Sequence, residues 1–147
     1  MPHWGAREIS PDAYGRLLRE GAIRIRAADP GAIILPAALA PTGEAGGANL
    51  SEVQFLDELY EWGGAEWFDG VAVQPYSFGQ PAGAEANPTE LNWNRALLVR
   101  EVMVRHGDAQ TAVWAVAFGG EGDAQEASSL VRQARTDWPW MGPMLWT

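Results

Sequence analysis

Residues Thr111 to Gly120 read TAVWAVAFGG, an apolar run of strand length that ends at two glycines. Valine, tryptophan and phenylalanine favour an extended conformation and Gly119-Gly120 breaks it, so we predict a buried strand over residues 111–118. The run contains no ionisable side chain. Catalytic groups in α/β folds are carried at the carboxyl ends of such strands, and here that position is Ala117. The stretch therefore indicates an α/β strand whose end carries no catalytic group.

Segments of helical periodicity alternate with apolar runs along the rest of the chain. Ser10-Pro11-Asp12 is a helix start, with a capping side chain and a proline at the first helical position, and we expect that helix to end near Ala28. The capping box Asn87-Pro88-Thr89-Glu90 predicts a second start, for a helix that ends near His106. Two more helices are predicted from about residue 50 to Gly63 and over residues 124–135.

Four strands are predicted, over residues 32–39, 68–74, 111–118 and 141–146. A helix lies in each connection between them, so the strands should be parallel, with right-handed crossovers. A complete (β/α)8 barrel has eight strands in about 250 residues, and this chain of 147 residues has about half of each. We therefore predict one α/β domain over residues 1–147, a parallel four-stranded half of a TIM barrel. Half a barrel has two unpaired strand edges, so we expect completion by homodimerisation, with a doubly wound α/β sheet as the alternative.

The formal net charge of −9 argues against nucleic acid and anionic membrane surfaces as partners, since both reward basic patches. No apolar run approaches the roughly 20 residues that span a bilayer, and the N-terminal MPHWGARE lacks the pattern of a signal peptide. We expect a water-soluble protein, either cytoplasmic or secreted as part of a longer parent. There is no cysteine, and no cluster of histidines and carboxylates has ligand spacing, so we predict neither a metal site nor a cofactor.

Four segments together resemble the retaining glycoside hydrolases built on (β/α)8 barrels, in particular their cellulase-like and xylosidase-like branch. They are LAPTG at 39–43, FDGVAVQPYS at 68–77, the helical segment 93–107 and VWAVAFG at 113–119. The resemblance rests on their order and spacing and covers nearly the whole chain. It implies that the chain corresponds to strands five to eight, the C-terminal half of such a barrel.

The resemblance also implies that the catalytic pair is missing. In this family the seventh strand ends in a glutamate nucleophile followed by Phe-Gly, and Ala117 stands at the matching position. The acid/base glutamate ends the fourth strand, which would lie before residue 1. Retaining hydrolysis needs two carboxyl groups about 5 Å apart, and alanine supplies none. Glu121 follows among three glycines, where it would not be held well enough to replace the nucleophile. We therefore expect a pseudoenzyme, related to enzymes that hydrolyse O-glycosidic bonds.

A residual oligosaccharide site at the carboxyl ends of the strands is a further implication. The sixth strand usually ends in His-Pro-Tyr in this family, where this chain has Gln74-Pro75-Tyr76, and an aromatic residue at the end of the last strand commonly forms the floor of the sugar subsite. The candidate substrate-binding residues are Gln74, Tyr76, Asn92, Trp93 and Trp146.

Two other interpretations of the chain stay open. It is either a structural, self-assembling or engineered scaffold without a ligand, or an active enzyme whose missing carboxylate comes from a partner chain. For Trp93, packing in the core or in an interface is the alternative role, and the same alternative holds for Trp62, Trp67, Trp114, Trp138 and Trp140.

Overall fold

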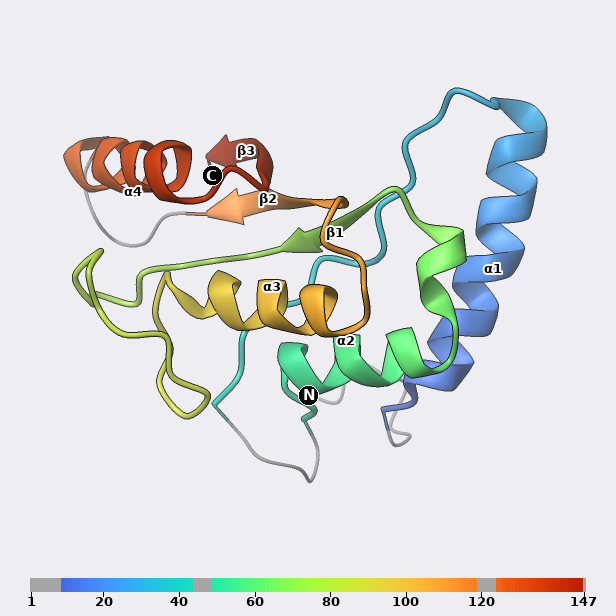
Figure 1. Cartoon of the computed structure of the whole chain (residues 1–147), viewed down its shortest axis with the longest axis horizontal. Coiled ribbons are helices and arrows are strands. Elements are labelled where there is room, and N and C mark those ends of the chain that lie inside the picture. The colour runs from blue at the N-terminus through green and yellow to red at the C-terminus, as the bar shows by residue number, and fades with distance from the viewer. Residues whose placement is uncertain (1–8, 44–48, 119–123, 147) are drawn as a thin grey trace.

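The computed structural model describes residues 9–43, 49–118 and 124–146. Figure 1 shows how the helices and strands alternate along the chain. In order they are α1 (Pro11–Ala28), α2 (Glu52–Glu61), the short 3-10 helix η1 (Gly64–Trp67), β1 (Gly70–Val73), α3 (Arg95–Arg105), β2 (Ala112–Phe118), α4 (Ala124–Asp137) and β3 (Met141–Trp146). No helix in these ranges combines the length and hydrophobicity that a membrane span requires.

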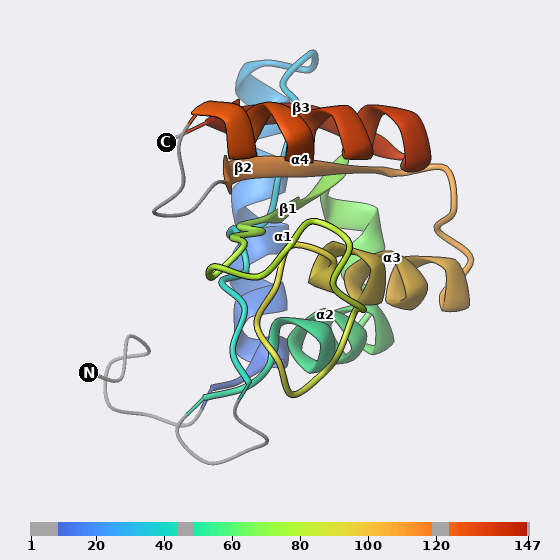
Figure 2. The ribbon, with the colours of Figure 1, turned by 90° about the vertical axis from the view of Figure 1, so that its left-hand side faces the viewer.

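The three strands form one parallel sheet in the order β1-β2-β3, with α3 and α4 in the two connections. Their arrowheads point to the same side in Figure 1, and Figure 2 looks toward this carboxyl end, with the loop between β1 and α3 in front. Both views place α2 and α3 side by side on the far side of β1 from α4. The predicted α/β architecture with parallel strands is confirmed.

The segment 32–39, predicted as the first strand, lies beside β1 without forming a regular strand. Leu39 makes a single parallel bridge to Val73, and the N–H of Asp69 donates to the carbonyl oxygen of Ile34 at 2.8 Å. Pro36 lies between these two points and has no N–H with which to continue a ladder. The described residues therefore contain three strands where four were predicted.

The first helix begins and ends where the sequence predicts, at Pro11 and Ala28, and the Oγ of Ser10 accepts a hydrogen bond from the N–H of Ala13. The helix predicted from the capping box at 87–90 starts later, at Arg95. Asn87 instead uses its side-chain oxygen to accept from the N–H of Thr89, which closes a local turn.

The guanidinium of Arg95 donates hydrogen bonds to backbone carbonyl oxygens of the segment before α3. Its Nη1 donates to the carbonyl oxygens of Asn87, Pro88 and Glu90. These carbonyls would otherwise accept from N–H groups further along a helix. The segment 87–90 is therefore fixed as a loop by a side chain that follows it.

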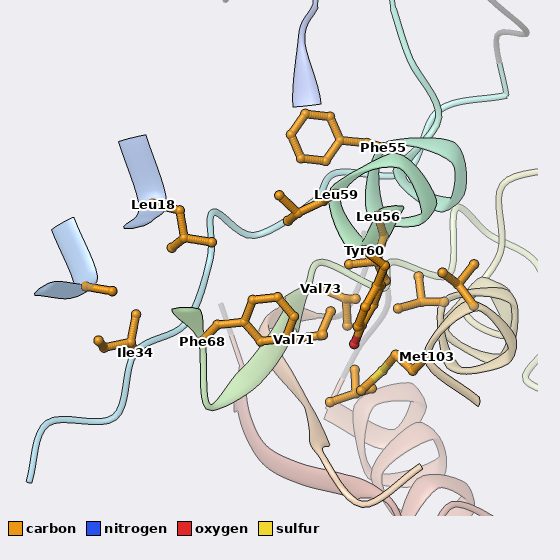
Figure 3. Close-up of a cluster of buried hydrophobic side chains, with 14 residues drawn as sticks. Leu18, Ile34, Phe55, Leu56, Leu59, Tyr60, Phe68, Val71, Val73 and Met103 are labelled. Carbon is orange, nitrogen blue, oxygen red and sulfur yellow. The ribbon is translucent and has the colours of Figure 1, made fainter. Parts of the chain in front are cut away.

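The main hydrophobic core lies between the helices and one face of the sheet. Figure 3 shows how strand and helix side chains meet there, with Tyr60 of α2 between the sheet and Met103 of α3. The members labelled in the figure are Leu18, Ile34, Phe55, Leu56, Leu59, Tyr60, Phe68, Val71, Val73 and Met103. A second cluster, Trp93, Ala96, Ala115, Leu130, Ala134 and Trp138, lies between the sheet, α3 and α4. Both clusters include a residue from the same face of β2, Val113 in the main core and Ala115 in the second cluster.

The opposite face of the sheet is apolar and partly exposed. Trp114 points to this face, because its two neighbours in β2 pack on the helices. A Cβ on Gly70 would lie 2.9 Å from Nε1 of Trp114, so the absence of a side chain at Gly70 leaves room for the indole. Ile33 and Leu145, which flank residues packed in the clusters, are 62% and 57% exposed. We call Ile33, Trp114 and Leu145 the open sheet face.

Candidate functional site

The first residues of the loop between β1 and α3 include two of the predicted binding residues, Gln74 and Tyr76. The N–H of Gln74 donates to the carbonyl oxygen of Leu39 at 3.3 Å, so the chain stays beside the segment 32–39 after the strand ends. The N–H of Tyr76 then donates to the carbonyl oxygen of Gln74 at 3.1 Å, in a tight bend around Pro75. Both side chains are half-buried. The end of β1 thus presents an amide and a phenol at the carboxyl end of the sheet.

A small cavity brings Gln74 and Asn92 together at this end of the sheet. Leu39, Pro41, Val73 and Pro75 form apolar parts of its wall, while Glu52 and Arg95 contribute polar atoms. The space inside is about 10 Å³, which is about enough for one water molecule and too small for a sugar ring.

Asn92 has an unused hydrogen-bond acceptor at this cavity. The residue is 1% exposed, and its Nδ2 donates to the carbonyl oxygen of Glu85 at 2.9 Å. Its Oδ1 is buried and has no hydrogen-bond partner among the described residues. A buried acceptor without a partner costs about 1–3 kcal/mol. Asn92 therefore lines the cavity with one buried acceptor left unpaired among the described residues.

A buried ion pair fixes the loops around the cavity. Nε of Arg95 donates to Oε1 of Glu52 at 2.7 Å, and the other carboxylate oxygen accepts from the N–H of Thr42 at 3.2 Å. Nη2 of Arg95 also donates to the carbonyl oxygen of Thr42. Because both charged groups are occupied by these bonds, we interpret the pair as structural support and not as an acid/base pair.

The ends of β2 and β3 lie side by side. Phe118 pairs in register with Trp146, and the register shifts between Ala115 and Phe118, where β2 has one more residue than β3. Bulges of this kind redirect side chains and are frequent beside active sites. The backbone of Ala117 lies in this irregular segment. The side chains of Ala117 and Trp146, and all of Glu121, lie outside the described residues.

Trp93 is placed in the core. Its side chain is fully buried, and its ring stacks on that of Trp138 with centroids 5.4 Å apart and an interplanar angle of 16°. Packing, the alternative role for this residue, therefore describes its position in the structure. Of the five predicted binding residues, Gln74, Tyr76 and Asn92 lie near one another in the described part of the chain.

Phe78 is a candidate that the sequence analysis missed. It is 46% exposed, and its ring lies edge-on to that of Tyr76, with centroids 6.0 Å apart. Its φ of 52° is in the left-handed region, which is unfavourable for a bulky residue, and Gly79 follows with φ of 73°. The N–H of Gln80 donates to the carbonyl oxygen of Ser77, which closes a turn that holds Phe78 at its tip. The Phe-Gly dipeptide just after Tyr76 is the sequence signal for this turn.

No group of three or more metal-ligating side chains is found in residues 9–43, 49–118 and 124–146. The polar side chains that line the small cavity are those of Gln74, Asn92, Glu52 and Arg95, and the last two are paired with each other.

Comparisons with known proteins give a distant structural likeness. No family model matches the sequence, and no curated protein matches it. Among solved structures, the chain is similar to AbfB, a family 51 α-L-arabinofuranosidase from Bifidobacterium longum, with a TM-score of 0.50 and 14% identity. The match covers 92% of this chain and 28% of that chain. The chain therefore has a distantly glycoside hydrolase-like fold, and its α/β arrangement is compatible with part of a TIM barrel.

Proposed function

We propose that this chain is a half barrel related to glycoside hydrolases, which binds oligosaccharide at the carboxyl ends of its strands and does not itself hydrolyse glycosidic bonds. The observation that most supports the proposal is Ala117 in the irregular end segment of β2, within a fold similar to that of an arabinofuranosidase. At this position the family resemblance requires a carboxylate nucleophile.

The chemistry of retaining hydrolysis supports a catalytically silent role, in which the chain does not hydrolyse glycosidic bonds. Two carboxyl groups about 5 Å apart are needed, one as nucleophile and one as acid/base. The carboxylate at the cavity, that of Glu52, is buried and already paired with Arg95. Protonating a leaving oxygen or attacking a sugar carbon would require this pair to separate within the fold.

The proposed mode of binding combines a hydroxyl anchor with an aromatic surface. A single hydroxyl fits the cavity, where the free Oδ1 of Asn92 accepts its hydrogen and the amide of Gln74 provides a second polar group. The sugar ring itself lies outside the cavity, with its C–H groups against Tyr76 and Phe78. Binding of this kind is weak, because most of the ring stays in water.

Isothermal titration and NMR titration of the purified chain test this site. Neutral arabino- and xylo-oligosaccharides should bind with dissociation constants in the range of about 1–10 mM. Tyr76→Ala and Gln74→Ala should weaken binding, whereas Gln54→Ala, the same substitution on an exposed face of α2, should not. Absence of oligosaccharide binding at about 10 mM sugar would refute the binding site. Steady hydrolysis of aryl glycosides by the purified chain would refute the catalytically silent role.

Self-association is a second candidate function, and the open sheet face favours it. Ile33 and Leu145 expose large apolar side chains on the face that the clusters leave uncovered, and Trp114 lies between them on the central strand. A second copy that covers this face would remove them from water. The net charge of −9 per chain opposes association, so a dimer should become tighter as salt is added.

Sedimentation equilibrium at low and high salt separates the two candidates. If the open sheet face is the interface, Leu145→Glu should shift the chain toward the monomer. Leu17→Glu, at a leucine of α1 that is 66% exposed, is the matched control and should leave the distribution unchanged. A monomer at micromolar concentration in both salts would eliminate the dimer and leave the oligosaccharide site untouched.

A further inference from the structure

A larger hollow lies at the opposite end of the sheet, where β2 and β3 begin. Its volume is about 360 Å³, and it is partly open to solvent. Small-molecule sites occupy about 300–1,000 Å³, so this hollow has the size of a ligand site, whereas the carboxyl-end cavity holds about one water molecule. The lining residues are Ala109, Gln110, Ala112, Pro139, Trp140, Met141 and Gly142.

One guanidinium, that of Arg100, contacts both loops that line the hollow, the loop before β2 and the loop before β3. Arg100 donates through Nη1 to the carbonyl oxygen of Thr111 at 3.0 Å and through Nη2 to that of Ala109, which fixes the loop before β2. Its Cζ also lies 5.6 Å from the ring centroid of Trp140, in the loop before β3. Trp138 stacks on the same indole, with centroids 5.2 Å apart. The hollow is therefore preorganised and loses little conformational entropy when a ligand enters.

The residues at the starts of β2 and β3 are small, which leaves room for the hollow between the two loops. Ala112 begins β2, and Gly142 is the second residue of β3. A Cβ on Gly142 would lie 3.4 Å from the Cβ of Ala112 and 3.4 Å from the indole of Trp114, so a residue larger than glycine would crowd this point.

The lining restricts the chemistry of a ligand. None of the seven lining residues carries a charge. The neighbouring guanidinium of Arg100 is already engaged by the carbonyl oxygens of Thr111 and Ala109 and by the ring of Trp140, so the lining favours a neutral ligand. Pro139, Trp140 and Met141 offer apolar surface, while Gln110 is exposed and its side-chain amide makes no hydrogen bond within the described residues. Because the hollow is partly open, one side of a bound ligand stays in contact with water, which favours a ligand that carries polar groups. A neutral ring with both C–H surface and hydroxyl groups meets these conditions.

We propose that this amino-terminal hollow is a second binding site, which takes one or two units of a neutral saccharide. The apolar wall contacts the C–H groups of a sugar ring, and the amide of Gln110 pairs with its hydroxyls. The site is on the opposite pole from Gln74 and Tyr76, so it does not depend on carbohydrate binding at the carboxyl ends.

NMR titration with cellobiose and xylobiose tests the proposal. On ¹⁵N-labelled chain, the indole N–H of Trp140 and the side-chain amide of Gln110 should shift in a saturable way below about 20 mM sugar. Gln110→Ala should weaken that binding about three-fold or more, since it removes a hydrogen-bonding group from an exposed position that the fold does not need. Gln74→Ala, the same substitution at the other pole, should leave the Trp140 and Gln110 shifts unchanged.

Two outcomes would overturn the proposal. One is the absence of any shift at Trp140 and Gln110 up to about 20 mM sugar. The other is a shift that persists in Gln110→Ala and disappears in Gln74→Ala, which would assign the only sugar contact to the carboxyl end. Failure of the carboxyl-end site gives a different result, in which Tyr76 does not respond and Trp140 still does.

Discussion

Nε of Arg95 lies 2.7 Å from Oε1 of Glu52, and each side chain is 3% exposed. One residue belongs to α3 and the other to α2, and the guanidinium also bonds to carbonyl groups of the segment 87–90 and of Thr42. The pair therefore joins two helices to both loops that surround the carboxyl-end cavity.

Glu52→Gln should destabilise the chain by about 3 kcal/mol or more, because it leaves the buried guanidinium without its countercharge. Asp12→Asn is the matched control, since it breaks the exposed pair of Asp12 with Arg16 and should cost at most about 1 kcal/mol. Urea denaturation of both variants measures the difference. Equal losses of stability would contradict the structural role given to the buried pair.

Two glycines of α1 should respond oppositely to the same substitution. A Cβ on Gly15 would lie 2.4 Å from the ring of Trp62, whereas nothing lies within 4 Å of a Cβ on Gly21. Gly21→Ala should stabilise the chain by about 0.5–1 kcal/mol through helix propensity. Gly15→Ala should destabilise it by about 1–3 kcal/mol despite the same gain, because the indole must move. Thermal unfolding measures both, and a stabilised Gly15→Ala variant would show that Trp62 repacks freely.

Replacing Phe78 should separate stability from binding. Its φ of 52° is unfavourable for a bulky side chain, so Phe78→Asn should leave stability unchanged or raise it by about 0.5–1 kcal/mol. The same variant should weaken oligosaccharide binding, because the exposed aromatic surface beside Tyr76 is lost. Chemical denaturation and titration on the same preparation provide the two readouts. Unchanged binding would remove Phe78 from the site.

Asp57 should contribute a small, pH-dependent stability. The Arg105 guanidinium at 2.8 Å, and then His106, lower the pKa of this carboxyl below its ordinary value of 3.8. Its contribution is therefore complete above that ordinary value and is lost as the pH falls through the lowered pKa. Asp57→Asn should cost at most about 1 kcal/mol at pH 7, and the difference from the parent chain should vanish in strong acid. A difference that grows as the pH falls would contradict this assignment.

Local signals in the sequence predicted the elements well where the deciding contacts are also local. Ser10 and Pro11 mark the start of α1 because capping acts within a few residues. The capping box at Asn87 failed as a helix start because the competing partner of its carbonyl groups, Arg95, is supplied from beyond the box. Pro36 interrupts the predicted first strand because it has no N–H to donate to a neighbouring strand. The apolar pattern of residues 32–39 does not reflect this lost hydrogen bond.

The place of Gln74 and Tyr76 in the fold follows from the sequence, whereas the surroundings of the other candidate residues do not. Parallel strands separated by helices place their carboxyl ends at one edge, so Gln74 and Tyr76 could be assigned to it from the sequence. The direction of a buried side chain depends on packing between distant segments, so the sequence alone does not separate Trp93, which stacks on Trp138, from the site residues. The hollow at Trp140 was not foreseen, because its space arises from small residues on two strands.

Trp93, Trp138 and Trp140 form a continuous stack from the core outward, with successive centroids 5.4 and 5.2 Å apart and rings within 16° of parallel. Chromophores this close couple electronically, so their combined signal will overlap the peptide bands in far-ultraviolet circular dichroism. Helix content derived from that spectrum will be biased for this chain. The same overlap makes the signal an optical reporter of whether β3 and α4 remain docked during unfolding.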